Sequence, residues 1–173
     1  MAWTTPGTAT AGQVLTASRW NTDVRDNSSF LYTPPMCKVR RNTDLTGYTS
    51  ATAVTWNQED IDTDGMYTSG TDITIKTAGV YLVHHKVYLT CTATLTGLGA
   101  ALGRNGTLFE YVRYPVQDTT SAYAECTKII SLAVNDTITA RPEVFGGSNY
   151  VLKGVATDTH VSTSLSVVWL GKG

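Results

Sequence analysis

The sequence has no excess of charge, no long apolar run and no leader. Its 13 lysines and arginines are balanced by 14 aspartates and glutamates, and the scattered charges form no basic footprint for nucleic acid. No run approaches the roughly 18 apolar residues that cross a bilayer. The N-terminus has no basic region followed by an apolar stretch, as a secretory signal would. We therefore expect a protein made in a cytoplasm, whose partners include neither nucleic acid nor membrane.

Residues suited to catalysis are also scarce. The cysteines, Cys37, Cys91 and Cys126, have no metal-ligand spacing, and we expect buried free thiols. His84 and His85 are adjacent in a strand-like run and face opposite sides, so His85 is expected to be a hydrogen-bonded core residue and His84 to face a subunit contact. No nucleophile–base pair, paired-carboxylate motif or glycine-rich phosphate loop is present. The sequence predicts a protein that is not an enzyme and has no cofactor.

One motif matches a calcium loop in part. Asp60, Asp62, Asp64 and Gly65 form D-x-D-x-D-G, which begins an EF-hand loop and directs alternate carboxylates at one point. The twelfth position is Thr71, where that loop needs a bidentate glutamate, and no helical pattern flanks the motif. We therefore expect a polar turn between strands and no metal, with the three aspartates as the only candidate ligands.

Threonine is abundant, with 30 residues beside 15 glycines and 9 tyrosines. This composition favours pleated strands joined by turns. Apolar and polar residues alternate most clearly in residues 80–92, 122–134 and 161–170, and Asn105-Gly106 is typical of a hairpin turn. We predict an all-β fold over residues 36–173, an antiparallel β-sandwich of the jelly-roll type.

Residues 1–35 have a different pattern. They begin with small and polar residues, continue with a predicted short helix over residues 15–31, and end at two prolines. The helix repeats four residues on one face: Trp20, Val24, Asn27 and Leu31. This stripe has too few apolar residues for the helix to be stable alone. We predict an N-terminal extended arm that docks on another surface and is dispensable for folding of the remaining domain.

The segment Ala78–Leu89, A-G-V-Y-L-V-H-H-K-V-Y-L, resembles the strand that C1q and tumour-necrosis-factor-like (TNF-like) domains carry as G-x-Y-x-F-x-Y-H-V. His85 stands where an aromatic residue is usual. The hairpin Gly103–Gly106 and the final run Ser164–Leu170 also match, so the resemblance covers roughly residues 37–173. It implies a C1q/TNF-like jelly roll of ten strands that assembles as a homotrimer.

We assign the trimer interface to the face of this strand that points away from the core. Its residues are Val80, Leu82, His84 and Tyr88. The apolar members would otherwise be exposed to water, which favours burial between subunits.

The segment Trp3–Leu31 is similar to an N-terminal segment that recurs on structural proteins of tailed bacteriophages. Its dense part runs L-T-A-S-R-W-N-T-D-V-R-D-N from Leu15. The resemblance implies a virion attachment module, and the residues that we assign to capsid attachment are Trp3, Trp20, Val24 and Leu31.

The two resemblances together predict a non-enzymatic structural protein of a phage virion. The leading hypothesis is a trimeric capsid decoration protein, made in the host bacterial cytoplasm, whose arm binds the major capsid protein or another virion protein. The alternative is a tail or baseplate receptor-binding protein that adheres to the host. A secreted C1q-like domain would need a signal peptide, and a β-sandwich hydrolase would need catalytic residues. The sequence also suggests no exposed aromatic–acidic cluster of the kind that binds sugars, which favours decoration over adhesion.

Overall fold

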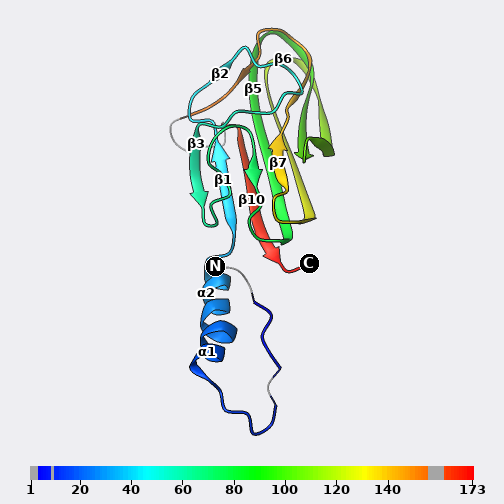
Figure 1. The fold of residues 1–173 in the computed structure, drawn as a ribbon. Helices are drawn as coiled ribbons and strands as arrows, with labels where there is room; N and C mark the ends of the chain where they lie inside the picture. Colours follow the sequence, from blue (N-terminus) through cyan, green and yellow to red (C-terminus); the bar gives the residue numbers. More distant parts are fainter. Residues whose placement is uncertain (1–3, 9, 156–161) are drawn as a thin grey trace.

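The computed structural model describes residues 4–8, 10–155 and 162–173. It has two parts, a β-sandwich and an N-terminal arm that projects from one end of the sandwich (Figure 1). The arm descends as an extended segment and returns as a helix, which leads directly into the first strand. Both β1 and β10 meet the arm at this end of the sandwich.

The helix of the arm has three consecutive pieces, α1 (Ala17–Trp20), the π-helical segment η1 (Asn21–Asp26) and α2 (Asn27–Tyr32). It begins at Ala17 and not at Leu15 because the Thr16 hydroxyl accepts a hydrogen bond from the backbone N–H of Arg19 at 3.2 Å, an N-cap. The prolines stop it after Tyr32, as expected.

Ten strands follow the arm. They are β1 (Met36–Arg40), β2 (Leu45–Thr46), β3 (Gln58–Asp62), β4 (Ile73–Thr74), β5 (Gly79–Arg104), β6 (Thr107–Leu132), β7 (Thr137–Ala140), β8 (Glu143–Gly146), β9 (Val151–Leu152) and β10 (Ser164–Gly171). Their pairings are antiparallel, which confirms the all-β jelly-roll prediction.

The long hairpin of β5 and β6 organises both layers of the sandwich. It turns at Asn105 and Gly106, whose φ angles of 50° and 82° suit the tight hairpin that the sequence predicts. The first half of β5 pairs with β10. On its other side β10 pairs with β1, and β1 pairs with β3. The second half of β5 pairs with β7 and β8. One strand therefore contributes to two sheets.

Alternation along β5 determines which side chains form the core. Tyr81, Val83, Val87 and Leu89 are fully buried, while the residues between them are half-buried on the opposite face. This confirms the core face that the sequence predicts for this strand.

Polar side chains close the edge of the sandwich along β6, which has β5 as its one strand partner among the described residues. Lys128 lies in phase with core residues of β6, and its ammonium pairs with the Glu110 carboxylate at 2.6 Å. The Tyr114 hydroxyl donates to the backbone carbonyl of Glu125 at 3.0 Å. The charge that interrupts the apolar pattern at Lys128 therefore connects the two halves of β6.

Candidate functional site

An aromatic contact joins the arm to the sandwich. The Phe30 side chain, 2% exposed, meets the Trp169 ring edge to face, with ring centroids 4.9 Å apart. The backbone N–H of Trp169 donates to the carbonyl of Pro35 at 2.9 Å, and the Lys172 ammonium donates to the Thr5 hydroxyl at 2.9 Å. The end of β10 therefore contacts both the helix and the extended segment of the arm.

This contact places Phe30 of the arm against the sandwich, while the dispensability of residues 1–35 for folding stays a prediction. Phe30 belongs to the same apolar cluster as the core of the sandwich. The predicted stripe missed Phe30 because it lies on a different side of the helix from Trp20, Val24 and Leu31. The sequence did contain one signal for this contact. Phe30 is an aromatic residue in the last helical turn, shortly before the first strand, where it can reach the sandwich.

Polar bonds hold the extended segment against the helix. Asn27, which is buried, accepts a hydrogen bond from the backbone N–H of Thr4 at 3.0 Å and donates to the carbonyl of Thr4 at 2.7 Å. Arg19 donates to the carbonyl of Gly7 at 2.7 Å and pairs with Asp23 at 3.3 Å. We call these contacts the polar latch. Asn27, predicted to share the docking stripe, belongs to the latch instead.

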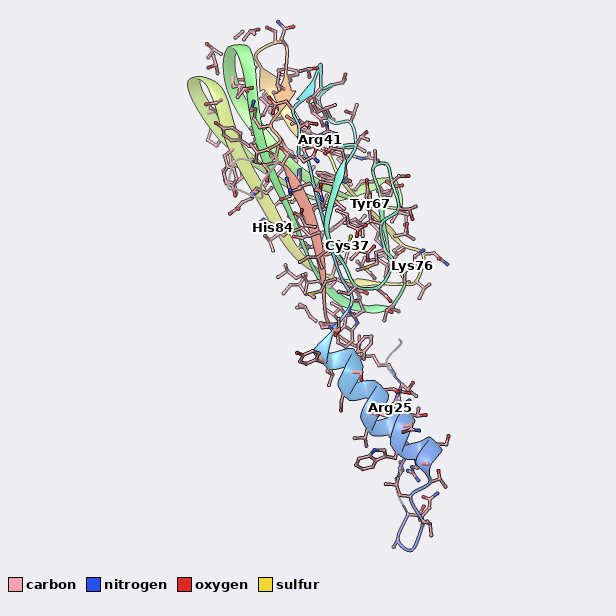
Figure 2. The ribbon with its side chains drawn as sticks, turned by 90° about the vertical axis from the view of Figure 1, so that its left-hand side faces the viewer. Arg25, Cys37, Arg41, Tyr67, Lys76 and His84 are labelled. Carbon is pink, nitrogen blue, oxygen red and sulfur yellow. The ribbon has the colours of Figure 1, made fainter. Side chains whose placement is uncertain are left out.

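The remaining residues of the stripe are exposed to solvent. Trp20, Val24 and Leu31 are 52%, 40% and 58% exposed. Figure 2 shows the helix, with Arg25 labelled on it, standing clear of the sandwich. Trp3, the fourth predicted attachment residue, lies outside the described residues. The three described anchors thus offer an apolar surface that no other part of the described chain covers.

The predicted trimer residues lie on the outward face of β5, where they are half-buried. Strand register places Leu82 between Val168 of β10 and Ile129 of β6, and Met36 of β1 continues this row beyond Val168. An apolar row therefore crosses four strands on the surface of the sheet. Figure 2 labels His84 on the same sheet.

Polar and aromatic residues border that row. The Nδ1 atom of His84 lies 2.8 Å from the Thr127 hydroxyl, within hydrogen-bond distance. Burial lowers the pKa of His84, Lys86 lowers it further, and Glu125 opposes both. Tyr88 lies opposite Tyr123, which is exposed at the edge of the sheet. This face can therefore make both apolar and polar contacts with a partner.

His85 lies in the core, as predicted, but without the expected hydrogen bond. It is fully buried, and neither ring nitrogen has a hydrogen-bond partner of ordinary geometry among the described residues. Burial lowers its pKa to about 3, and the nearby Ala101 backbone offsets only part of that effect. His85 is therefore a neutral core residue, inaccessible to substrate.

The cysteines are buried free thiols, as the sequence predicts. Burial raises the pKa of Cys126 to about 12, and it also raises the pKa of Cys37. Both remain protonated thiols at neutral pH and are therefore poor nucleophiles.

The three aspartates of the partial calcium motif have separate partners. Asp60 pairs with the buried Arg40 at 2.8 Å, and Asp62 accepts the backbone N–H groups of Met66 and Tyr67 at 3.0 and 2.9 Å. Asp64 accepts a hydrogen bond from the Thr77 hydroxyl at 2.8 Å. Within the described part of the chain, no three potential ligands lie together as a metal site.

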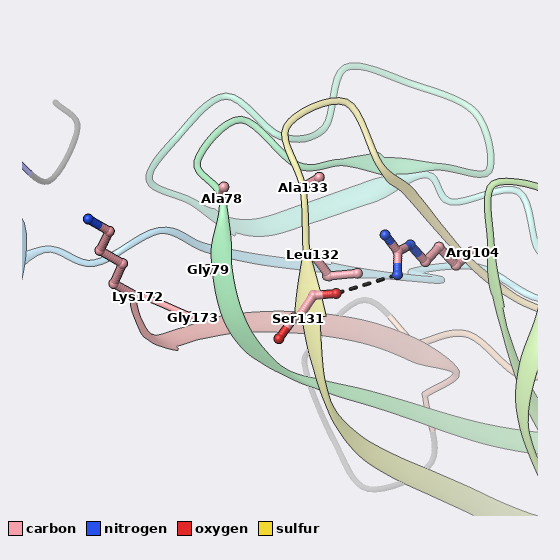
Figure 3. A pocket seen from close by; sticks show the side chains of 8 residues that line it. All are labelled: Ala78, Gly79, Arg104, Ser131, Leu132, Ala133, Lys172 and Gly173. Carbon is pink, nitrogen blue, oxygen red and sulfur yellow. Dashed lines mark hydrogen bonds between the residues drawn. The ribbon is translucent and has the colours of Figure 1, made fainter.

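A cavity of about 530 Å³ lies beside the end of β10. Lys172 and Arg104 lie on opposite sides of it (Figure 3). Both cations already have partners, since Lys172 contacts Thr5 and Arg104 pairs with Asp136 at 2.7 Å. The lining contains no nucleophile–base pair.

Exposed tyrosines lie beside carboxylates, contrary to the sequence-based expectation. The Tyr123 hydroxyl donates to the Glu125 carboxylate. Burial raises the pKa of Tyr111, and the nearby Glu143 carboxylate raises it further. Both rings are exposed. Tyr123 and Glu125 are two residues apart on β6 and share a face, so the sequence contained the signal for that pair. Tyr111 and Glu143 are near each other only because β6 and β8 both pair with β5. The argument that an aromatic–acidic cluster is lacking is therefore wrong.

Comparisons with known proteins bear on the fold. No protein-family model matches the sequence, and no curated protein is significantly similar to it. Among solved structures, the globular domain of zebrafish complement 1qA protein is 14% identical, with a TM-score of 0.58 over 80% of this chain and 99% of that chain. Eiger TNF from S. frugiperda is 13% identical, with a TM-score of 0.61 over 80% and 95%.

A third similar structure is murine APRIL at pH 8.5, which is 16% identical, with a TM-score of 0.56 over 79% of this chain and 98% of that chain. At these identities the similarity shows the fold alone, and it confirms the C1q/TNF-like jelly roll. None of the three is a virion protein, so the phage assignment of the arm stays a prediction. No helix among the described residues is long and apolar enough to cross a membrane.

Proposed function

We propose that this protein is a non-enzymatic structural module that forms a homotrimer through its jelly roll and attaches to a larger assembly through its arm. The observation that carries the proposal is the exposure of Trp20, Val24 and Leu31 on a helix that is itself firmly mounted. A large apolar patch on a soluble protein usually marks an interaction site. An aromatic anchor on a pre-ordered element loses little conformational entropy on binding.

The assembly that we propose is the virion of a tailed bacteriophage, with the protein as a capsid decoration protein. Support comes from the resemblance of Trp3–Leu31 to phage attachment segments. The mounting by Phe30 supports the same assignment, since it sets the arm at a defined angle to the sandwich. The partner would be the major capsid protein or another virion protein, and the module would be made in the host cytoplasm.

Host adhesion by a tail or baseplate protein is the second candidate. The exposed tyrosine–carboxylate pairs at Tyr123 and Tyr111 favour it, because such pairs suit recognition of polar ligands. In this case the arm would attach to a tail component, and the sandwich would face the host.

The apolar row through Leu82 supports trimer formation. It crosses β1, β10, β5 and β6 and leaves apolar side chains partly in water. Because a closed ring of three copies buries the same patch on each copy, the row would be removed from solvent without leaving an open end.

Leu82→Arg tests the trimer. We expect sedimentation of the full chain to give a trimer for the wild type and a monomer for this variant, because the arginine would be buried without a partner charge. Leu108→Arg is the matched control, since Leu108 is exposed at the β5–β6 hairpin, away from the row. A monomeric wild type would refute the trimer and leave the arm proposal standing.

Trp20→Ala tests attachment. Loss of an aromatic anchor worth about 2 kcal/mol would weaken binding roughly thirtyfold per subunit. The measurement is occupancy on phage particles that lack the protein. Tyr32→Ala is the control, because Tyr32 follows Leu31 and lies about 100° further around the helix. Equal occupancy by wild type and Trp20→Ala would show that the arm is not the attachment surface.

A further inference from the structure

On the outward face of the second sheet, the central strand has glycine at three of four successive positions, with Ala101 as the fourth. In β5, Leu98, Ala100 and Leu102 belong to the core, and the intervening positions that face outward include Gly97, Gly99 and Gly103. Glycine weakens a strand, and its repeated use marks a place where other groups approach the backbone closely. Here those groups come from the neighbouring strands β6 and β8.

Planar side chains lie flat on this glycine floor. A Cβ atom at Gly99 would lie only 2.6 Å from Cε2 of Tyr111, and one at Gly97 would lie 3.0 Å from Nε of Arg113. The Arg113 guanidinium also stacks on the Phe145 ring, 3.9 Å from its centroid. The Tyr111 ring is 39% exposed. The sheet therefore presents an aromatic face and a guanidinium face side by side, and we call this surface the glycine-floored platform.

The platform carries hydrogen-bonding groups with free capacity. Stacking uses the face of the Arg113 guanidinium, and no described residue accepts from the N–H groups at its edge. At the other end, over Gly103, the hydroxyl of Thr139 and Nε of Arg141 are buried without a hydrogen-bond partner among the described residues. Thr139 is only 5% exposed. Because Thr139 and Arg141 Nε are buried, the accessible donors are the N–H groups of the exposed Arg113, and they point to a ligand that accepts hydrogen bonds.

Along β5, the Glu143 carboxylate lies between two guanidinium groups, that of Arg113 near Gly97 and that of Arg141 near Gly103. Glu143 is opposite Gly99 in the sheet. Its carboxylate lies near Tyr111, where it adds to the effect of burial in raising the pKa of that hydroxyl. From Gly97 to Gly103 the strand rises about 20 Å, enough for more than one sugar ring. The platform thus combines a stacking surface, a central acceptor and excess positive charge.

We propose that the glycine-floored platform binds an acidic saccharide. A sugar ring would stack on Tyr111, its carboxylate or sulfate would accept the in-plane N–H groups of Arg113, and its hydroxyls would donate to Glu143. The carboxylate of Glu143 disfavours a phosphate of higher charge at the same place. The platform lies on the sheet that does not carry the Leu82 row, and no residue of the arm lines it. The site is therefore independent of the proposed trimer and of attachment.

The test is a titration of the full chain with two acidic sugars and a neutral comparator for each, 3′-sialyllactose with lactose and trigalacturonate with α-1,4-galactotriose. Saturation-transfer NMR detects binding, and calorimetry gives the affinity. We expect at least one acidic sugar to bind at least tenfold more tightly than its neutral counterpart. Failure of both acidic sugars to bind at about 10 mM, or equal affinity within both pairs, would overturn the proposal.

Two variants locate the site. Arg113→Ala is expected to weaken acidic-sugar binding at least tenfold, while Arg25→Ala, which removes an exposed arginine of the arm, leaves it unchanged. Gly99→Ala would displace the Tyr111 ring without altering any charge and is expected to weaken binding similarly. Thermal unfolding of each variant checks that the sandwich is intact, and Tyr111→Ala replaces Gly99→Ala if the latter unfolds. If Arg113→Ala binds the acidic sugars with the same affinity as the wild type, the platform is not their binding site.

Discussion

The arm and the sandwich are ordered by opposite means. The sandwich excludes water from an apolar cluster that contains residues such as Val83, Leu89 and Leu165. The arm holds its extended segment against its helix with polar side chains, chiefly Asn27 and Arg19. It turns Trp20, Val24 and Leu31 outward. Apolar side chains that are not needed for internal packing are free to bind a partner. Apolar side chains therefore stabilise the sandwich by packing inside it, whereas in the arm they are available to dock on a partner.

The largest expected effect separates two aromatic residues of the same helix. Phe30→Ala should destabilise the protein by about 3–5 kcal/mol, because it leaves a cavity beside Trp169 in the core. Trp20→Ala should change the free energy of unfolding by less than about 0.5 kcal/mol, because the indole is largely in solvent. Denaturant unfolding of both variants measures the difference.

A small effect of Phe30→Ala would mean that the arm is mounted by its polar contacts and not by the aromatic contact. In that case the variant lacking residues 1–35 should fold as well as the full chain. A large effect of Trp20→Ala would instead place the indole inside the folded unit.

The next effect is a pH dependence of the sandwich. His85 binds a proton below pH 6.5 when unfolded but only near pH 3 when buried, so the unfolded state takes up more protons as the pH falls. Stability from neutral His85 is fully present above pH 6.5 and declines below it, by about 2 kcal/mol between pH 6.5 and pH 5. His85→Phe should remove this part of the slope.

The measurement is denaturant unfolding at several pH values for both proteins. His84, whose pKa burial also lowers, is present in both, so the difference between the curves isolates His85. Parallel curves for the two proteins would show that His85 acquires a proton without unfolding.

A smaller effect concerns the polar latch. Asn27→Ala removes two hydrogen bonds to Thr4 and should release the extended segment, with a local loss of about 1 kcal/mol. Hydrogen exchange at the Thr4 amide should accelerate about fivefold, while the melting temperature of the sandwich is unchanged. Ser28→Ala, at an exposed neighbouring position, is the control. Unchanged exchange would mean that the segment is held elsewhere.

The smallest expected effect is that of calcium. Because Asp60, Asp62 and Asp64 have separate partners, neither calcium nor a chelator should shift the melting temperature. Differential scanning calorimetry with and without each reagent is sufficient. An upward shift of several degrees with calcium would establish a site there and show that the loop rearranges around the ion.

The sequence by itself determined the all-β class, the core face of the longest strand and the hairpin turn, and it placed the helix start within two residues. Side chains alternate every second residue in a strand, so the core face of β5 follows directly from the order of its residues. The turn at Asn105-Gly106 and the cap at Thr16 depend on the local backbone, which neighbouring residues control. Such features need no knowledge of distant partners.

Only the tertiary structure decided the roles of residues that depart from the apolar–polar periodicity of their helix or strand. Phe30 became a core residue because β10 brings Trp169 to the foot of the arm, and Lys128 became an edge contact because the two halves of β6 meet. The glycines of β5 became a floor because strand pairing places Tyr111 beside them. Each of these contacts joins residues whose proximity depends on strand order and sheet curvature, and periodicity along the chain records neither.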